Sequence, residues 1–409
     1  MALSAERLEV LLLVAAIVAM VARRLRLPYT VGLVVAGIGL ALLGAESVPQ
    51  LTREMVFTAF LPPLIFEAAL HMNWKALRRD MIVVGVLATL GVVVSAGCIV
   101  LGMHFVAGWS WEAALLFGVL ISATDPVSVI ATFKEAKVGG RLHLLMESES
   151  LFNDGTVAVL FGLALATVGG GHVEAGEIPR RFLVTVVGGI TCGGAVSALV
   201  LLLAGRTTDH LVEITFTTAA AYGSFLVAEH FGLSGVMATM TAGVLVGNVG
   251  PAGAISIRGR EEVASFWEYA AFVANSLVFL LIGARLTQEN LLKGWLPVLI
   301  AIGAVILGRA LSVYGCSVLW HWSAWRVRAR DQHMLFWGGL RGALALALAL
   351  GLPSEVAGRD NIVMVAFGVV TFSVLVQGLT IVPLLRRSAL TGPGPDEVAG
   401  SEPGLQPAL

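Results

Sequence analysis

The sequence predicts an all-α integral membrane protein with about thirteen transmembrane helices. Its 409 residues are 57% hydrophobic and only 13% charged, whereas soluble domains carry about 25% charged residues. The apolar run over residues 83–100 lacks the alternation of polar and apolar positions that a membrane β-barrel needs. In two further runs, proline or clustered glycines interrupt the apolar pattern, which indicates helices broken within the bilayer.

Apolar runs bounded mostly by charged residues or by proline and glycine locate each helix. In chain order, the predicted helices span residues 6–22, 30–44, 54–71, 80–107, 112–136, 144–169, 180–205, 210–230, 232–249, 262–286, 292–321, 332–352 and 360–386. They form one transmembrane domain over residues 1–387. The Pro- and Gly-rich segment 388–409 is predicted to be a short disordered cytoplasmic tail.

Basic residues predict the orientation of these helices. Short cytoplasmic loops are enriched in Lys and Arg, and most such residues fall in alternate connections, starting with the first. With an odd number of crossings, this places the N-terminus outside and the C-terminus in the cytoplasm. We therefore expect a multi-pass protein of the plasma membrane, the inner membrane in a bacterium, with lipid as a partner. The net charge of −1 gives no indication of nucleic acid binding.

The two interrupted runs predict a pair of crossing broken helices. Ser122 to Pro126 interrupts the fifth run, and Gly338 to Gly342 interrupts the twelfth. Proline removes a backbone donor, and glycine weakens a helix. Broken helices at corresponding places in two halves of a chain are typical of secondary transporters built from inverted repeats. We therefore predict two inverted repeats.

Ionisable residues inside the predicted helices are candidates for function, because each costs about 2.5–3.5 kcal/mol to insert. They are Glu67, Asp125, Glu147, Glu149, Asp154, Glu213, Glu229, Glu268, Arg309 and Arg341. Glu213, Glu229 and Glu268 lie near helix ends, where their side chains can reach the membrane interface. The others need a partner or a function within the protein.

The sixth predicted helix places Ser150 one turn before Asp154, so a hydroxyl and a carboxylate share one face. Hard oxygen ligands of this kind suit a dehydrated monovalent cation, and unwound backbone near Thr124 can add a carbonyl oxygen. A buried carboxylate can hold either a proton or a cation, and such competition is sufficient for exchange. Asp125 and Arg341 are placed to complement the dipoles of the half-helices.

Four ordered motifs give this sequence a family resemblance. Residues 61–68 (LPPLIFEA), 123–127 (ATDPV), 149–155 (ESLFNDG) and 338–343 (GGLRGA) together resemble the sodium/proton exchangers of the cation/proton antiporter-1 family. The likeness extends over about residues 6–386. It implies the antiporter fold of thirteen helices, a homodimer, and a six-helix ion-translocating core that moves against a dimerisation bundle.

The resemblance also assigns roles to individual residues. Asp154 exchanges cation for proton, and the Na⁺ ligands fall on Asp154, Ser150, the Thr124 carbonyl and Asp125, with Glu67 assisting through water. Glu149 pairs with Arg309, and Asn153 hydrogen-bonds that pair. Arg341 neutralises the broken-helix ends. Because electrogenic relatives carry a second Asp at the position of Asn153, the resemblance implies electroneutral exchange of one cation for one proton.

Other functions remain open at this point. The cation is Na⁺, Li⁺ or K⁺, because selectivity depends on fine details of ligand geometry, and a K⁺/H⁺ antiporter is an alternative. A cation channel is disfavoured because there is no repeated selectivity loop. An intramembrane protease with Asp125 and Asp154 as a dyad needs two carboxylates sharing one proton. We expect a transporter, not an enzyme, with no cofactor beyond the transported Na⁺ and H⁺.

Overall fold

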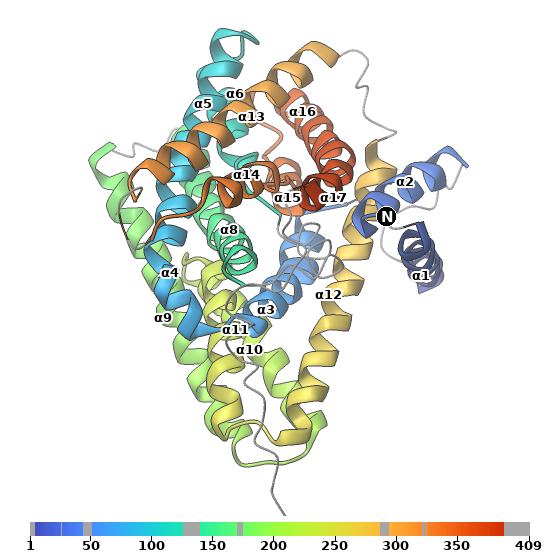
Figure 1. Ribbon diagram of the computed structural model, residues 1–409, viewed down its shortest axis with the longest axis vertical. Helices are drawn as coiled ribbons and strands as arrows, with labels where there is room; N and C mark the ends of the chain where they lie inside the picture. Colours follow the sequence, from blue (N-terminus) through green and yellow to red (C-terminus); the bar gives the residue numbers. More distant parts are fainter. Residues whose placement is uncertain are drawn as a thin grey trace, which may run out of the picture.

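The computed structural model is mainly helical, and no strand occurs in the part of the chain that it describes (Figure 1). The described residues are 5–25, 27–43, 51–125, 140–169, 175–286, 294–320, 323 and 325–387. In chain order, the elements are α1 (Ala5–Leu25), α2 (Tyr29–Leu42), η1 (Met55–Phe60), α3 (Leu61–His71), α4 (Trp74–Val86), η2 (Leu87–Gly91), α5 (Val92–Phe105), α6 (Trp111–Leu120), α8 (Arg141–Val168), η3 (Ala175–Glu177), α9 (Ile178–Ala204), α10 (His210–His230), α11 (Gly235–Val249), η4 (Gly250–Ala252), α12 (Ile257–Leu286), α13 (Trp295–Val318), α14 (Ala329–Trp337), α15 (Ala343–Leu350), α16 (Arg359–Phe372), η5 (Ser373–Gln377) and α17 (Gly378–Arg387).

Each predicted apolar run overlaps at least one of these helices, but several helices begin earlier than the run does. α4 begins at Trp74 rather than at residue 80, because the Asn73 side chain accepts a hydrogen bond from the Ala76 N–H at 3.1 Å and caps the helix. α12 likewise begins at Ile257 rather than at residue 262. Charged turns therefore continue these helices beyond the apolar stretch.

Seven helices within the described residues are long and apolar enough to cross a bilayer. They are Trp74–Phe105, Arg141–Val168, Ile178–Ala204, His210–His230, Ile257–Leu286, Trp295–Val318 and Arg359–Ile381. Four shorter apolar helices accompany them, at Tyr29–Leu42, Met55–His71, Trp111–Leu120 and Gly235–Val249. The architecture is that of a multi-pass membrane protein. The predicted tail at 388–409 lies outside the described residues.

The helices pack in two groups. In the first, α12 packs on α2 and α3, α11 on α3 and α9, and α10 on α9 and α11. In the second, α13 packs on α5, α8 on α4 and α6, and α15 on α16. Figure 1 shows α5, α6 and α13 to α16 in the upper part of the view and α10 and α11 in the lower part, with α9 and α12 extending upward on either side. We call the first group, with α1, the bundle, and the second, with α14 and α17, the core.

Close helix contacts in the bundle depend on glycine. A Cβ atom at Gly37 of α2 would overlap the Leu280 carbonyl of α12, and one at Gly283 of α12 would overlap the Val34 carbonyl of α2. Small residues let transmembrane helices approach closely, because lipid provides no hydrophobic force to drive them together. The close approach of α2 and α12 is therefore possible only because Gly37 and Gly283 lack side chains.

Glu213, near the start of α10, is buried and hydrogen-bonded inside the protein. Its side chain is fully buried, and its carboxylate accepts hydrogen bonds from the Ser256 N–H at 2.8 Å and the Ser256 hydroxyl at 3.0 Å. These bonds hold the start of α12 against α10. The buried charge is a structural capping group rather than part of a transport site. Glu229, by contrast, is exposed.

Candidate functional site

Two breaks in the helices lie against each other inside the core. The first covers residues 121–125 after α6, and the second covers residues 338–342 between α14 and α15. The Asp125 N–H donates to the Leu340 carbonyl at 2.7 Å, so a backbone hydrogen bond joins the two breaks. A Cβ atom at Gly342 would overlap the Asp125 side chain. Glycine at this position therefore permits the close contact.

Arg341 lies at the centre of this contact and is 1% exposed. Its Nη1 donates to the carbonyls of Ser122 at 2.7 Å and Ala123 at 3.1 Å. These carbonyls follow the C-terminal end of α6, where backbone acceptors lack helical partners and positive charge is favourable. α6 ends before Pro126 is reached, so the break begins earlier than the position of the proline suggests. The Arg341 guanidinium donates to carbonyls that would be bonded by backbone N–H groups if the helix continued.

α8 carries Asp154 into contact with a cavity. One of its carboxylate oxygens, Oδ1, is buried and has no hydrogen-bond partner among the described residues. Ser150, one turn earlier on α8, is buried and accepts a hydrogen bond from the Thr124 hydroxyl at 3.2 Å. The first break therefore contacts α8 at Ser150, one turn before Asp154, whose Oδ1 can still accept a hydrogen bond or bind a cation.

Glu149 and Arg309 form a buried bidentate ion pair. Arg309 Nη1 lies 2.7 Å from Glu149 Oε1, and Nη2 lies 2.9 Å from Oε2. Nη2 also donates to the Leu335 carbonyl at 2.9 Å. The pair thus joins α8, α13 and α14, and each of the two buried charges has an oppositely charged partner within the core.

The expected hydrogen bond from Asn153 to this pair is not formed among the described residues. Asn153 is 2% exposed, and its Oδ1 has no hydrogen-bond partner there. Arg309 Nε likewise has no hydrogen-bond partner in the described chain, so this N–H and the Asn153 amide oxygen do not meet in this conformation. The prediction that Asn153 bonds the pair is therefore wrong for this conformation.

A cavity of about 1120 Å³ leads to the site. Asp154, Thr124, Asp125 and Gly342 line it, and its lining also includes exposed residues in the predicted cytoplasmic connections, notably Lys75, Arg79 and Arg141. Five buried residues of the site do not line the cavity and lie behind its wall: Glu149, Ser150, Asn153, Arg309 and Arg341. Water and small ions can therefore reach Asp154 from the side that carries these basic residues.

Glu67 faces the same cavity from the bundle. It lies on α3, its side chain is 20% exposed, and one of its oxygens is 3.5 Å from His71 Nδ1. Four of the five predicted ligand residues, Glu67, Thr124, Asp125 and Asp154, thus share one cavity, and Ser150 supports Thr124 from behind. The site lies where the bundle meets the core.

Comparison with known proteins identifies the family. The sequence model of the family described as sodium/hydrogen exchanger, transmembrane, matches residues 10–387. The chain belongs to this exchanger family. The Na⁺/H⁺ antiporter ApNhaP of Aphanothece halophytica is 40% identical over 369 residues, covering 90% of this chain and 71% of that protein. The Na⁺/H⁺ antiporter NhaH of Halobacillus dabanensis is 33% identical over 395 residues, covering 93% of this chain and 97% of that protein.

A solved structure shares the fold of this exchanger family member. The sodium proton antiporter MjNhaP1 from Methanocaldococcus jannaschii matches with a TM-score of 0.74 at 19% sequence identity, covering 92% of this chain and 97% of that one. The resemblance inferred from the four motifs is therefore confirmed. The relatives are multi-pass transporters rather than enzymes, which agrees with a plasma-membrane location.

The cavity lining also contains polar residues to which the sequence assigned no role in transport. Glu147 and His143 lie one turn apart on α8, with 3.8 Å between the carboxylate and Nδ1, and Glu268 and Asn275 face the cavity from α12. The spacing of His143, Glu147 and Asp154 places all three on one face of α8. This helical spacing could have revealed His143 and Glu147 from the sequence, because they lie on the same face of α8 as Ser150 and Asp154.

Proposed function

We propose that the protein exchanges Na⁺ for H⁺ across the membrane by alternating access, with Asp154 holding the cation and the proton in turn. The observation that carries this proposal is the position of Asp154 in the lining of the cavity, with one buried oxygen that has no hydrogen-bond partner in the described chain. A buried carboxylate oxygen without a partner is costly. Binding either a proton or a cation removes that cost.

The residues around Asp154 suit a small hard cation. Asp125 and the Thr124 carbonyl come from the first break, Ser150 comes from α8, and Glu67 approaches from α3. Oxygen atoms of carboxylates, carbonyls and hydroxyls are the ligands that dehydrated alkali ions prefer. We infer that the Na⁺ ion is held by Asp154, Ser150, Thr124 and Asp125, with Glu67 acting through water.

The two helix groups provide a basis for alternating access. The ligands other than Glu67 lie in the core, and the cavity is enclosed between core and bundle. Movement of the core against the bundle can therefore close one path to Asp154 and open another. By the distribution of basic residues, the cavity opens to the cytoplasm, so we infer that this conformation faces inward. Inverted repeats are consistent with the paired breaks.

We also infer that the protein acts as a homodimer. Large apolar side chains are exposed along α1 and α9, including Leu13, Met20, Leu183 and Leu202. In a membrane, such faces contact either lipid or a second copy. The family resemblance favours a second copy on the bundle, with lipid around the rest.

We predict that exchange moves no net charge. Glu149 is neutralised by Arg309, and Asn153 is uncharged, so neither changes charge during the cycle. Asp154 then replaces one Na⁺ with one H⁺. In proteoliposomes, the rate of Na⁺-driven proton movement should stay the same when a K⁺ diffusion potential of either sign is imposed. A rate that follows the sign of the potential would show electrogenic transport.

The cation is identified by running the same flux assay with Na⁺, Li⁺ and K⁺ in turn. Proton movement with Na⁺, with or without Li⁺, supports the proposal. Proton movement with K⁺ alone would replace it with K⁺/H⁺ exchange at the same site.

A further inference from the structure

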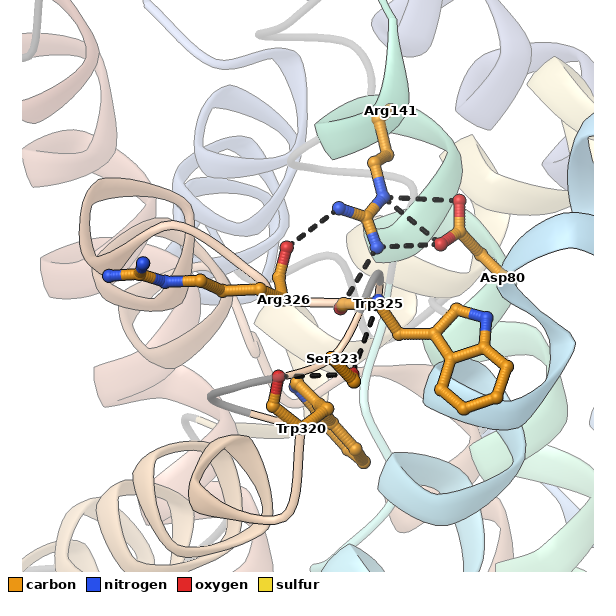
Figure 2. A network of polar contacts seen from close by, with 6 residues as sticks. All are labelled: Asp80, Arg141, Trp320, Ser323, Trp325 and Arg326. Carbon is orange, nitrogen blue, oxygen red and sulfur yellow. Dashed lines mark hydrogen bonds and ion pairs between the residues drawn. The ribbon is translucent and has the colours of Figure 1, made fainter.

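A polar network centred on Arg141 contains none of the proposed cation ligands (Figure 2). Three of its residues, Asp80, Arg141 and Trp325, line the cavity. The guanidinium of Arg141 grips the carboxylate of Asp80: Nη2 lies 2.7 Å from Oδ1, and Nε lies 3.0 Å from Oδ1 and 3.2 Å from Oδ2. The same guanidinium donates to the carbonyls of Arg326 at 2.8 Å and Trp325 at 3.1 Å. One side chain therefore satisfies acceptors from two distant segments.

These contacts join three segments of the core. Asp80 lies on α4, Arg141 is the first residue of α8, and the two carbonyls belong to the connection between α13 and α14. Asp80 is 4% exposed. The Trp325 N–H donates to the Ser323 hydroxyl at 3.2 Å, and that hydroxyl donates to the Trp320 carbonyl at 3.1 Å, which folds this connection back toward α13. The acceptors of Arg141 are thus themselves held in place.

The network is more than an ordinary surface ion pair. Exposed pairs contribute little to stability, except where the geometry is bidentate or several groups form a network. Although the side chain of Arg141 is 41% exposed, its partner carboxylate is only 6% exposed, and the guanidinium adds two backbone acceptors. Lysine has no planar fork of donors and cannot reproduce this set.

Arg141 begins the helix that carries the cation site. At 1.5 Å per residue, α8 separates Arg141 from Asp154 by about 20 Å. A tilt at the start of α8 therefore displaces Asp154 and Ser150 relative to Thr124, which belongs to the first break. Cation coordination is sensitive to displacements well below 1 Å.

We propose that Arg141 is a positioning residue for cation binding: its clamp on Asp80 and on the Trp325 and Arg326 carbonyls fixes α8 within the core. The inference rests on the proposed cation exchange. It requires that loss of the clamp weakens cation binding more than it slows turnover, because the ligands are displaced while the helices remain folded. It also requires that a lysine at this position fails to replace arginine.

A purely electrostatic role makes the opposite prediction. Arg141 is a positive charge at the mouth of a path for cations, so its removal would raise the local cation concentration and lower the KM for Na⁺. A clamp predicts a higher KM. Arg79 is a matched control, because it is an exposed arginine on α4 that lines the same mouth.

The test measures Na⁺-dependent proton flux in proteoliposomes for wild type, Arg141→Gln, Arg141→Lys and Arg79→Gln. We expect the KM for Na⁺ to rise about fivefold or more in both Arg141 variants, with a smaller change in maximal rate, and to stay level or fall in Arg79→Gln. Wild-type kinetics in Arg141→Lys, or a lower KM in Arg141→Gln, would overturn the proposal. Equal losses of maximal rate at constant KM would show a structural role only.

A second measurement does not depend on transport. Hydrogen exchange of the purified protein should be faster at the start of α8 and in residues 325–330 in both Arg141 variants, and unchanged there in Arg79→Gln. Unchanged exchange in the Arg141 variants would overturn the clamp even if the wild type transports Na⁺. If the wild type shows no Na⁺/H⁺ exchange, the proposed function fails, while this measurement still decides whether the clamp exists.

Discussion

Replacing Asp154 with asparagine is expected to abolish Na⁺-dependent dissipation of a pH gradient in proteoliposomes. Asparagine has nearly the same shape as aspartate but cannot take up and release a proton in the transport range, and it lacks the charge that holds a cation. The rate should fall to that of protein-free liposomes. The folded structure should persist, because Oδ1 of Asp154 makes no hydrogen bond in the described chain that the substitution could break.

The matched control is Asp360→Asn, the same chemical change at the start of α16, where the carboxylate side chain is 97% exposed and does not line the cavity. This variant should exchange at the wild-type rate. Both proteins should give the same size-exclusion profile and thermal stability as wild type. Wild-type exchange by a folded Asp154→Asn protein would remove Asp154 from the centre of the mechanism.

Breaking the Glu149–Arg309 pair should cost about 3–5 kcal/mol of stability, because removal of one partner leaves a buried charge uncompensated. Glu149→Gln and Arg309→Gln are therefore each expected to lower the melting temperature strongly and to reduce the amount of folded protein. The double variant should be more stable than the sum of the two single losses predicts, because no lone charge remains.

Thermal unfolding followed by size exclusion measures these differences for all three variants. Arg309→Gln should lose more than Glu149→Gln, because Arg309 also donates to the Leu335 carbonyl. Single variants that unfold at the wild-type temperature would show that the pair adds nothing to the fold. Additive losses in the double variant would show that the two side chains act independently.

The positions of the helices could be predicted from the sequence because lipid-exposed and buried faces are both apolar. The boundaries of the helices were harder to predict, because α4 and α12 begin with charged turns that a hydropathy pattern does not detect. The first break was predicted from Pro126, yet α6 already ends at Leu120. Beyond this end, Arg341 donates a hydrogen bond to the Ser122 carbonyl, although the two residues are 219 positions apart in the chain.

Within the candidate site, periodicity along one helix was informative, whereas contacts between helices had no local signal, and the Glu149–Arg309 pair was expected only from the family resemblance. The spacing of Ser150 and Asp154 placed a hydroxyl and a carboxylate one turn apart, and the structure adds the hydrogen bond from the Thr124 hydroxyl to Ser150. The expected bond to Asn153 failed because it depends on where a guanidinium from α13 lies. Likewise, the clamp between Asp80 and Arg141 joins residues 61 positions apart, and no local pattern indicates it.

In the proposed exchange, one carboxylate accepts either a proton or a sodium ion. The protons released when Na⁺ binds to the purified protein can be counted by titration calorimetry in buffers of different ionisation enthalpy. At a pH where Asp154 is protonated, we expect one proton to be released for each Na⁺ bound, the Na⁺ affinity to weaken as the pH falls further, and Asp154→Asn to release none. Sodium binding that releases no proton at any pH would show that the two ions do not compete for Asp154.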